Sequence, residues 1–246
     1  MNKLRVLDLF SGIGGFSLGL EKSHFETVAF CEIDPYCRKV LAKHWPEIPI
    51  YEDVTKARFE EVGPVDMVTA GFPCQDISLA GQGAGLEGER SGLFWQILRT
   101  ASVVGRPKLL LENVAALLDR GLCTVLGAMA QIGYDAEWHC IPACFVGAWT
   151  KRDRIWVYAN PREKHVEGVG KGPIFEQSDL SREPARIFER WPGRSNLPQS
   201  RLAGTSDGLR NRLDAIGNTI VPQIPEMIGY AILATYDKKE GSDGED

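Results

Sequence analysis

Long hydrophobic runs are missing from this chain. No apolar stretch approaches the roughly 18 residues that a membrane-spanning helix needs. The first residues, 1–6, enter a strand-like apolar pattern at once, and this opening does not resemble a targeting segment. We therefore expect a cytoplasmic protein with no membrane partner.

Patterns that hold metals or form disulfide frameworks are also missing. The six cysteines lie at irregular spacings, and no pair forms a Cys-x-x-Cys motif. Such spacing supports neither a zinc cage nor a secreted disulfide scaffold. His139, Cys140 and Cys144 come nearest to a ligand cluster, but on a strand-like segment they are better interpreted as small buried side chains. We predict reduced thiols and no metal.

A general excess of positive charge, the usual mark of a nucleic-acid-binding protein, is absent, because the chain has a net charge of −5. The charge is unevenly distributed, however. Residues 151–212 hold 13 Lys or Arg against 8 Asp or Glu. Binding depends on the local field more than on the total charge, so this basic segment keeps a polyanionic partner among the candidates.

Short apolar segments alternate with amphipathic segments over the first 160 residues. The predicted strands are Arg5–Phe10, Thr27–Glu32, Ile48–Tyr51, Val65–Gly71, Lys108–Glu112, Tyr134–Ile141 and Ile155–Ala159. The predicted helices between them are Phe16–Lys22, Pro35–His44, Leu93–Val104 and Cys123–Ile132. This alternation predicts an α/β fold, with a Rossmann-like, doubly wound, mostly parallel sheet that helices cover on both faces.

The alternation stops near residue 160. Residues 161–212 are rich in Gly, Pro, Arg and Glu and show little periodicity, which predicts a small loop-rich module. Order returns at residue 213, and apolar residues at helical spacing over 222–236 predict a last helix that packs back on the first domain. We therefore expect residues 1–160 and 213–237 to form one discontinuous domain, followed by a flexible acidic tail over 238–246.

A glycine-rich turn, Phe10-Ser11-Gly12-Ile13-Gly14-Gly15, follows the first predicted strand. Such a turn before a helix lets a ligand approach the backbone closely. Glu32 ends the second predicted strand, where its carboxylate can accept hydrogen bonds from both hydroxyls of a ribose. The pair predicts an adenosine-containing cofactor, and NAD and S-adenosylmethionine suit it about equally. A purely structural turn is the remaining alternative.

Two further residues bear on the cofactor. Ser17 stands where the strict dinucleotide fingerprint has glycine, which disfavours NAD. Asp53 follows the third predicted strand, where it can bond the amino group of an adenine. Capping of a turn within residues 52–55 is an equally good interpretation of this aspartate.

Cys74 follows a proline directly after the apolar run Val65–Ala70, within Gly71-Phe72-Pro73-Cys74-Gln75. A strand that ends in a rigid turn holds a thiol in one direction, which suits a nucleophile. Taken by itself, Cys74 is better interpreted as a buried cysteine that acts as a small hydrophobe.

Glu112 ends another predicted strand beside that of Cys74. Partial burial there raises the pKa of a carboxyl and lets it carry a proton near neutral pH. The alternative is a glutamate bonded to a neighbouring helix N-terminus. Arg152 and Arg154, two residues apart, are predicted to point to one side of the sheet, toward an anion or a polar base edge. A solvated charged edge is the alternative for these arginines.

Taken together, these blocks resemble the DNA cytosine-5 methyltransferase family. The matching segments, in the order of that family, are Asp8–Gly15, Glu32, Asp53, Gly71–Ser78, Glu112–Val114, Arg152 with Arg154, and Gly217–Pro222. The stretch from Cys74 to Phe94 also resembles the mobile catalytic loop of the family. Thr150 stands where the family usually has glutamine, and the region that corresponds to its target-reading part is short.

The resemblance implies transfer of a methyl group from S-adenosylmethionine to carbon 5 of cytosine in duplex DNA, on a base that is swung out of the helix. It implies a monomeric enzyme of a prokaryote or a phage, paired with a restriction enzyme or acting alone, in which residues 161–212 recognise the target. Cys74 is then the nucleophile, Glu112 holds or donates a proton at ring nitrogen 3, and Arg152 and Arg154 stabilise nearby anions. The cofactor-binding residues that it implies are Phe10, Ser11, Gly12, Ile13, Gly14, Gly15, Glu32, Ile33, Asp53, Val54, Gly71, Pro73, Leu93, Asn218 and Thr219.

Four other functions compete with this interpretation. A small-molecule dehydrogenase explains the glycine turn and Glu32 but gives no role to Cys74 and Glu112. An exocyclic-amine methyltransferase is suggested by Asp34-Pro35-Tyr36, which lacks the second proline of that signature. An RNA cytosine-5 methyltransferase of the same superfamily would use identical chemistry. A non-enzymatic DNA-binding relative is disfavoured, because every residue that catalysis needs is present.

Overall fold

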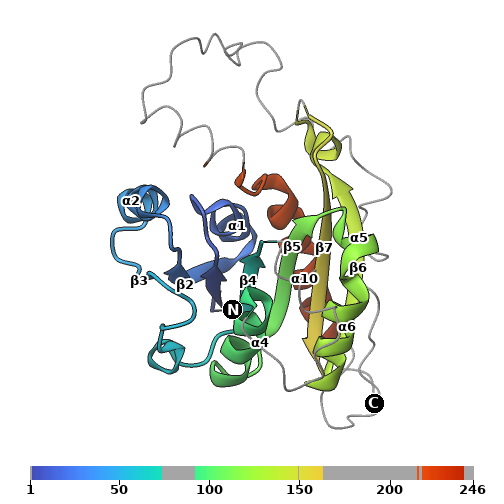
Figure 1. Ribbon diagram of the computed structural model, residues 1–246, viewed down its shortest axis with the longest axis horizontal. Helices are drawn as coiled ribbons and strands as arrows, with labels where there is room; N and C mark the ends of the chain where they lie inside the picture. The colour runs from blue at the N-terminus through green and yellow to red at the C-terminus, as the bar shows by residue number, and fades with distance from the viewer. Residues whose placement is uncertain (1, 74–91, 149, 163–214, 216–217, 241–246) are drawn as a thin grey trace.

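A computed structural model describes residues 2–73, 92–148, 150–162, 215 and 218–240 (Figure 1). Several sequence predictions fall outside these residues. They are Cys74 and the loop that follows it to residue 91, nearly all of the module predicted over 161–212, Gly217, and the tail from residue 241.

The described strands form one seven-stranded sheet in the order β3-β2-β1-β4-β5-β7-β6. Their bounds are β1 Leu4–Leu9, β2 Phe25–Cys31, β3 Ile50–Tyr51, β4 Met67–Gly71, β5 Lys108–Val114, β6 Tyr134–Pro142 and β7 Asp153–Pro161. Strands β1 to β5 run parallel, whereas β7 is antiparallel to both β5 and β6. The predicted Rossmann-like, mostly parallel sheet is confirmed.

The direction of β7 has a simple cause. Only residues 143–152 join β6 to β7, and they include the short 3-10 helix η3 (Ala143–Val146). A parallel crossover needs a dozen or more residues, so the chain turns back on itself. The beginning of β7 therefore lies at the edge of the sheet where β4 and β5 end.

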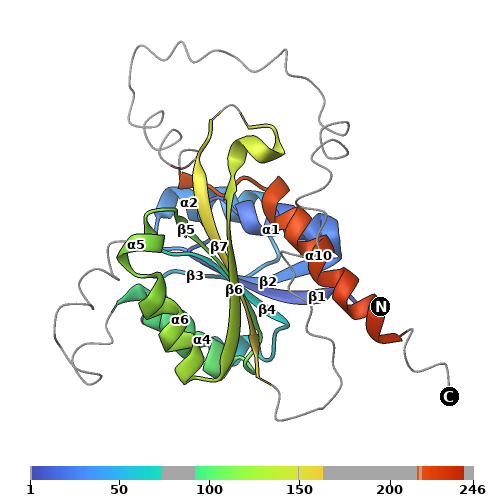
Figure 2. The same ribbon diagram turned by 90° about the vertical axis from the view of Figure 1, so that its right-hand side faces the viewer.

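Helices cover both faces of the sheet (Figure 2). Their bounds are α1 Gly15–Leu20, α2 Pro35–His44, α4 Leu93–Val103, α5 Leu117–Arg120, α6 Leu122–Gln131 and α10 Gln223–Glu240, with the 3-10 helices η1 Glu21–Ser23 and η2 Phe59–Val62 between them. Helices α4 and α6 lie on one face, and α1 and α10 on the other. The predicted return of the last helix is confirmed, because α10 packs against α1. None of the described helices is both long and apolar enough to cross a membrane.

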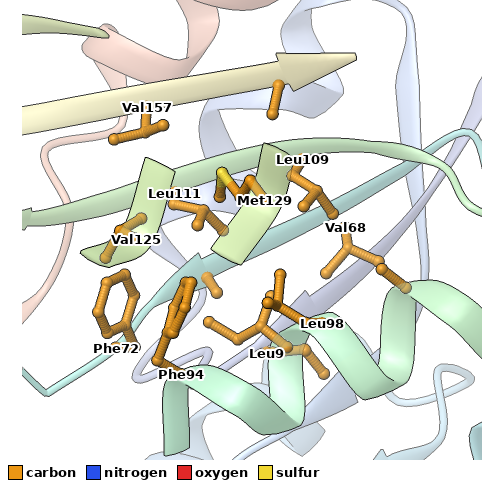
Figure 3. Close-up of a cluster of buried hydrophobic side chains, with 14 of the residues drawn as sticks. Leu9, Val68, Phe72, Phe94, Leu98, Leu109, Leu111, Val125, Met129 and Val157 are labelled. Atoms are coloured by element: carbon orange, nitrogen blue, oxygen red, sulfur yellow. The ribbon is translucent and has the colours of Figure 1, made fainter. Parts of the chain in front are cut away.

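Each face has its own apolar core. The first core joins the sheet to α4 and α6 (Figure 3) and includes Leu9, Val68, Phe94, Leu111, Val125 and Met129. The second joins the sheet to α1 and α10 and includes Phe16, Leu20, Trp156, Ile224 and Ile228. Burial on both faces explains why strands of the sheet carry apolar residues at consecutive positions, as in Val6-Leu7 of β1 and Leu109-Leu110-Leu111 of β5.

Candidate active site

The glycine turn lies between β1 and α1. Phe10, Gly12 and Gly14 have positive φ angles of 53°, 55° and 87°. Gly14 needs to be glycine because the Trp45 ring lies 2.6 Å from the place that a Cβ would take, and Gly15 because the carbonyl oxygen of Ile220 lies equally close. Among the described residues, no atom lies within 4 Å of the corresponding place on Gly12. Gly12 is therefore the glycine of this turn that leaves room for a ligand.

Glu32 follows β2 and holds this turn in place. Its side chain is mostly buried, with Oε2 accepting a hydrogen bond from the Gly12 amide at 2.7 Å and Oε1 one from the Asp34 amide at 2.8 Å. Each oxygen of a carboxylate has a second lone pair, so Glu32 can still accept hydrogen bonds from two hydroxyls. The next residue, Ile33, is 71% exposed and offers an apolar surface at the same strand end.

Asp53 caps a turn, as the alternative interpretation of the sequence proposed. Its Oδ1 accepts hydrogen bonds from the backbone amide and the hydroxyl of Thr55, and its Oδ2 pairs with Lys56 at 3.0 Å. The Thr55 hydrogen bonds, together with Lys56, lower the pKa of Asp53 to about 2. A contact to adenine stays a prediction. The adjoining Val54 is buried, and its carbonyl accepts a hydrogen bond from Arg99 of α4 at 2.8 Å.

Glu112 lies on β5 directly opposite Gly71 of β4. Its carboxyl is only 11% exposed, and Oε1 pairs with Arg154 Nε at 2.8 Å. Burial raises the pKa of Glu112 to about 7, although the charges of Arg154 and Arg152 act in the opposite direction. Desolvation therefore outweighs the arginines, and the carboxyl can hold a proton near neutral pH.

The two arginines occupy different positions. Arg154 belongs to β7 and contacts Glu112 directly, which the reversed strand permits because β5 ends where β7 begins. Arg152 precedes the strand with a φ angle of 35°, a strained conformation for a residue with a side chain. Burial, followed by the charge of Arg154, lowers the pKa of Arg152. The structure thus brings Arg154 against Glu112 and places Arg152 close enough to act on it through charge.

Asn113 belongs to a block that resembles the family, but the sequence analysis gave it no role at the site. It is 3% exposed, and its Nδ2 donates to the Phe72 carbonyl at 2.9 Å, immediately before Pro73. The Phe72 ring packs against Phe94 of α4, with centroids 5.5 Å apart (Figure 3). Phe72, two residues before Cys74, and Phe94, three residues after residue 91, thus contact each other, and Phe72 is also bonded to β5. The available signal was an amide side chain within a buried apolar strand, which must find a partner.

The remaining predicted cofactor residues lie around the same edge of the sheet. Gly71 ends β4, and a Cβ there would lie 3.4 Å from Glu112 Oε2. Thr219 is partly buried beside the start of α1, with its hydroxyl 3.0 Å from the place of a Cβ on Gly15. Asn218 and Pro73 are exposed, and Leu93 is the first residue of α4.

One alternative interpretation loses its support. Asp34-Pro35-Tyr36 is the start of α2: the Asp34 carboxylate accepts hydrogen bonds from the amides of Tyr36 and Cys37, and Pro35 occupies the first turn. This capping accounts for the three residues without a catalytic role. Within the described part of the chain, no group of three or more His, Cys, Asp or Glu side chains is arranged to hold a metal ion.

Comparison with known proteins agrees with this geometry. The Type II methyltransferase M2.BsuMI of Bacillus subtilis (strain 168) is 36% identical over 196 residues, which are 75% of this chain and 49% of that protein. The Type II methyltransferase M.Eco47II of Escherichia coli is 38% identical over 165 residues, which are 64% of this chain and 40% of that protein. The chain spans about half the length of the curated relatives it matches.

A crystal structure of a Spodoptera frugiperda DNMT2 variant has the same fold. It superimposes with a TM-score of 0.53 at 18% identity, covering 65% of this chain and 50% of that chain. The model of the family described as C-5 cytosine-specific DNA methylase matches residues 4–203. The chain therefore belongs to the C-5 cytosine-specific DNA methylase family.

Proposed function

We propose that this chain transfers a methyl group from S-adenosylmethionine, the donor that its family uses, to carbon 5 of cytosine in duplex DNA. The observation that carries the proposal is the burial, pKa and position of the Glu112 carboxyl. Its carboxyl is buried, has a pKa of about 7, and lies beside the strand that leads to Cys74. It also lies at the sheet edge that holds the glycine turn. A proton donor for a ring nitrogen is thus built next to a ligand-binding turn.

The described residues fit the cofactor. Gly12 leaves open space, Glu32 retains lone pairs for the ribose hydroxyls, and Ile33 offers an exposed apolar surface to the adenine. Phe10, Ser11, Ile13, Gly14, Gly15, Asp53, Val54, Gly71, Pro73, Leu93, Asn218 and Thr219 complete the proposed binding residues. When bound, S-adenosylmethionine supplies an electrophilic methyl group attached to a sulfonium.

The chain's own residues make carbon 5 of cytosine nucleophilic. The Cys74 thiolate adds to carbon 6, and Glu112 delivers its proton to ring nitrogen 3, which takes up the displaced electron density. The resulting enamine would present a nucleophilic carbon 5 to the methyl group of a bound donor. Solvent or a basic group then takes the proton from carbon 5, and the electrons of that bond restore the double bond between carbons 5 and 6 and expel the Cys74 thiolate. Ring nitrogen 3 returns its proton to Glu112, which restores the starting state of the chain.

A protonated Glu112 also removes an obstacle to forming the nucleophile. A free thiol with a pKa near 8.5 is only about 3% thiolate at neutral pH, and a nearby carboxylate would reduce that fraction. The neutral carboxyl of Glu112 does not oppose the thiolate. Arg152 and Arg154 favour the anions that form during the reaction, whereas their charges also limit how far the pKa of Glu112 rises.

The target base must swing out of the duplex stack to reach the site, which costs a few kcal/mol. We propose that the basic segment 151–212 contacts phosphates and holds the duplex during this step. The relatives M2.BsuMI and M.Eco47II come from bacteria, and M.CviJI comes from a Chlorella virus; all three are named Type II methyltransferases. We accordingly propose action as a monomer in the cytoplasm of a prokaryotic or phage-infected cell, with or without a cognate restriction enzyme.

Bisulfite sequencing tests the proposal. The wild-type chain is incubated with S-adenosylmethionine and a mixed-sequence DNA duplex, in parallel with RNA of the same sequence. We expect modified cytosine in the duplex. Modification of the RNA alone would overturn the substrate, and modification of neither would overturn the activity.

The nucleophile is tested with Cys74→Ser and a matched control, Cys123→Ser, which alters an exposed cysteine of α6. The fluorine of 5-fluorocytosine blocks release of the cysteine, so the wild type should form a lasting covalent complex with DNA that contains this base. Cys74→Ser lacks the thiol and should abolish both turnover and this complex. Cys123→Ser should keep both. Turnover by Cys74→Ser would refute the assignment of the nucleophile.

A further inference from the structure

Asp8 is a buried acid that the proposed reaction does not use. It lies on β1 with no exposed surface, and none of the ion pairs among the described residues includes it. A carboxyl buried without a cation lowers stability compared with an apolar side chain of similar size. Stability alone therefore does not account for an acid at this position.

The contacts of Asp8 connect the two halves of the site. Its Oδ2 accepts a hydrogen bond from Ser17 Oγ of α1 at 3.0 Å, and its Oδ1 one from Thr69 Oγ1 of β4 at 2.7 Å. Ser17 lies in the helix that the glycine turn begins. Thr69, the register partner of Asp8, lies on β4, which ends at Gly71, three residues before Cys74 in the sequence. All three side chains are fully buried.

The protonation state of Asp8 decides whether its carboxyl can accept both of these hydrogen bonds. Burial raises the pKa of Asp8 to about 7, with a small further rise from Glu32, while the Thr69 and Ser17 hydroxyls lower it. The ionised carboxylate accepts both hydrogen bonds. The protonated carboxyl has to donate one hydrogen bond itself, so one of the two contacts must reverse.

Few other titratable groups lie close enough to Asp8 to affect its gain or loss of a proton. Among the described residues, the titratable groups that face Asp8 are Glu32 and Cys31, at the end of β2. Burial raises the pKa of the Cys31 thiol to about 12, so it stays neutral wherever Asp8 titrates. Ser17 and Thr69, the contacts from α1 and β4, carry no charge.

We propose that Asp8 is a positioning residue, whose carboxylate fixes the cofactor turn relative to the strand of the catalytic cysteine by accepting hydrogen bonds from Ser17 and Thr69. The inference rests on the proposed use of S-adenosylmethionine. Beyond the proposed function, it assigns to one side chain, which gains and loses a proton near neutral pH, the alignment of the cofactor turn with β4. Its effect is on cofactor affinity, through α1, rather than on the chemical step.

Calorimetric binding of S-adenosylmethionine to wild type and Asp8→Asn tests the proposal. Asparagine presents one acceptor and one donor, as the protonated acid does. We therefore expect the two proteins to bind about equally at about pH 6, and the variant to bind about tenfold more weakly at about pH 8, the effect of one lost hydrogen bond. The ratio between the proteins cancels titration of the ligand's own amino group. The same ratio at both pH values would overturn the proposal.

Two donor variants and a control complete the experiment. Ser17→Ala removes the contact by which Asp8 acts on α1, so its affinity should be low and about the same at both pH values. Thr69→Val keeps that contact and removes a hydroxyl that lowers the pKa of Asp8, so it should move the pH dependence of binding upward. The pH dependence of binding in these two variants tests the proposal even if Asp8→Asn does not fold. Thr100→Val removes a buried hydroxyl of α4 that bonds only to its own helix, at Gln96, and should leave the affinity at wild-type level at both pH values. Absence of cofactor binding by the wild type would instead refute the proposed function, and this inference with it.

Discussion

At the scale of single residues, Glu112 is subject to two opposing effects. Desolvation favours its neutral form, and the Arg154 guanidinium at 2.8 Å favours its charged form. The pKa of about 7 reflects an excess of the first effect over the second. A carboxyl in this condition is suited to give up and recover a proton at the pH of a cell.

The balance at Glu112 predicts the pH dependence of turnover. Because the protonated form is the proposed acid, kcat should fall as the pH rises through about 7. Arg154→Ala removes a cation that lowers the pKa of Glu112, so this fall should move to higher pH, whatever happens to the absolute rate. Glu112→Gln should lose the fall altogether and reduce kcat by about 10²- to 10⁴-fold.

The control for this experiment is Lys22→Ala, which breaks an ion pair with Glu226 of α10, outside the proposed site residues and the basic segment 151–212. Its pH profile should match that of the wild type. Steady-state methyl transfer, measured with saturating cofactor across the neutral range, provides the test. An unshifted profile in Arg154→Ala would mean that the titrating group is not Glu112.

At the scale of elements, the contact between α1 and α10 depends on glycine. A Cβ on Gly19 would lie 2.1 Å from the Pro222 carbonyl oxygen and 2.8 Å from Pro225 Cγ, immediately before and within α10. Such a position cannot accept a methyl group unless one helix moves. Gly127, which lies on the exposed side of α6, has no described atom within 4 Å of the same place.

These two glycines form a matched pair for a stability measurement. Gly19→Ala should lower the free energy of unfolding by about 1–3 kcal/mol through overpacking. Gly127→Ala should raise it by about 0.5–1 kcal/mol, because alanine has less backbone freedom to lose in a helix. Urea unfolding followed by circular dichroism measures both. Equal effects of the two changes would show that α10 does not press against α1.

The sequence predicted the elements better than it predicted their directions and contacts. The described strands, and the described α-helices other than α5, were expected within a few residues, because apolar periodicity reports burial on a face. Periodicity carries no information about direction, so the reversal of β7 followed only from the short connection before it. The ends of elements such as α4 and β5 differed by one or two residues, as capping decides them locally.

Site residues were predictable where the residue type itself indicates chemistry. Glu112 and the glycine turn belong to that class. Asn113 and Arg99 do not, because each donates to a backbone carbonyl, and any residue type supplies such an acceptor. The hydrogen bond from the Gly12 amide to Glu32 was also missed, although both residues were expected at the site, because almost any residue type supplies a backbone amide.

At the scale of the whole molecule, the site lowers stability at higher pH. The pKa of Glu112 is raised from 4.5 to about 7, so between these values the folded chain binds more protons than the unfolded chain. The stabilisation from this group is complete below its unfolded pKa and is lost as the pH rises toward 7. Asp8 acts with the same sign, because its pKa is also raised, from 3.8 to about 7.

This linkage predicts a pH-dependent effect of Glu112→Gln on unfolding. Relative to wild type, the variant should gain up to about 3 kcal/mol between about pH 4 and about pH 8, because glutamine has no charge to desolvate. Urea unfolding of both proteins at the two pH values measures the change, and the comparison cancels the groups that they share. A gain in the opposite direction would show that Arg154 outweighs burial at Glu112.

The antiparallel course of β7 also bears on how the sheet finds its correct alignment. Arg154 lies opposite Val114, two residues beyond Glu112 on the same face of β5. A misregistered sheet, displaced by one residue, would put Asp153 or Ile155 in the place of Arg154. Either error leaves Glu112 without its cation, and one of them sets two carboxylates against each other. The ion pair between Arg154 and Glu112 thus also favours correctly aligned strands while the chain folds.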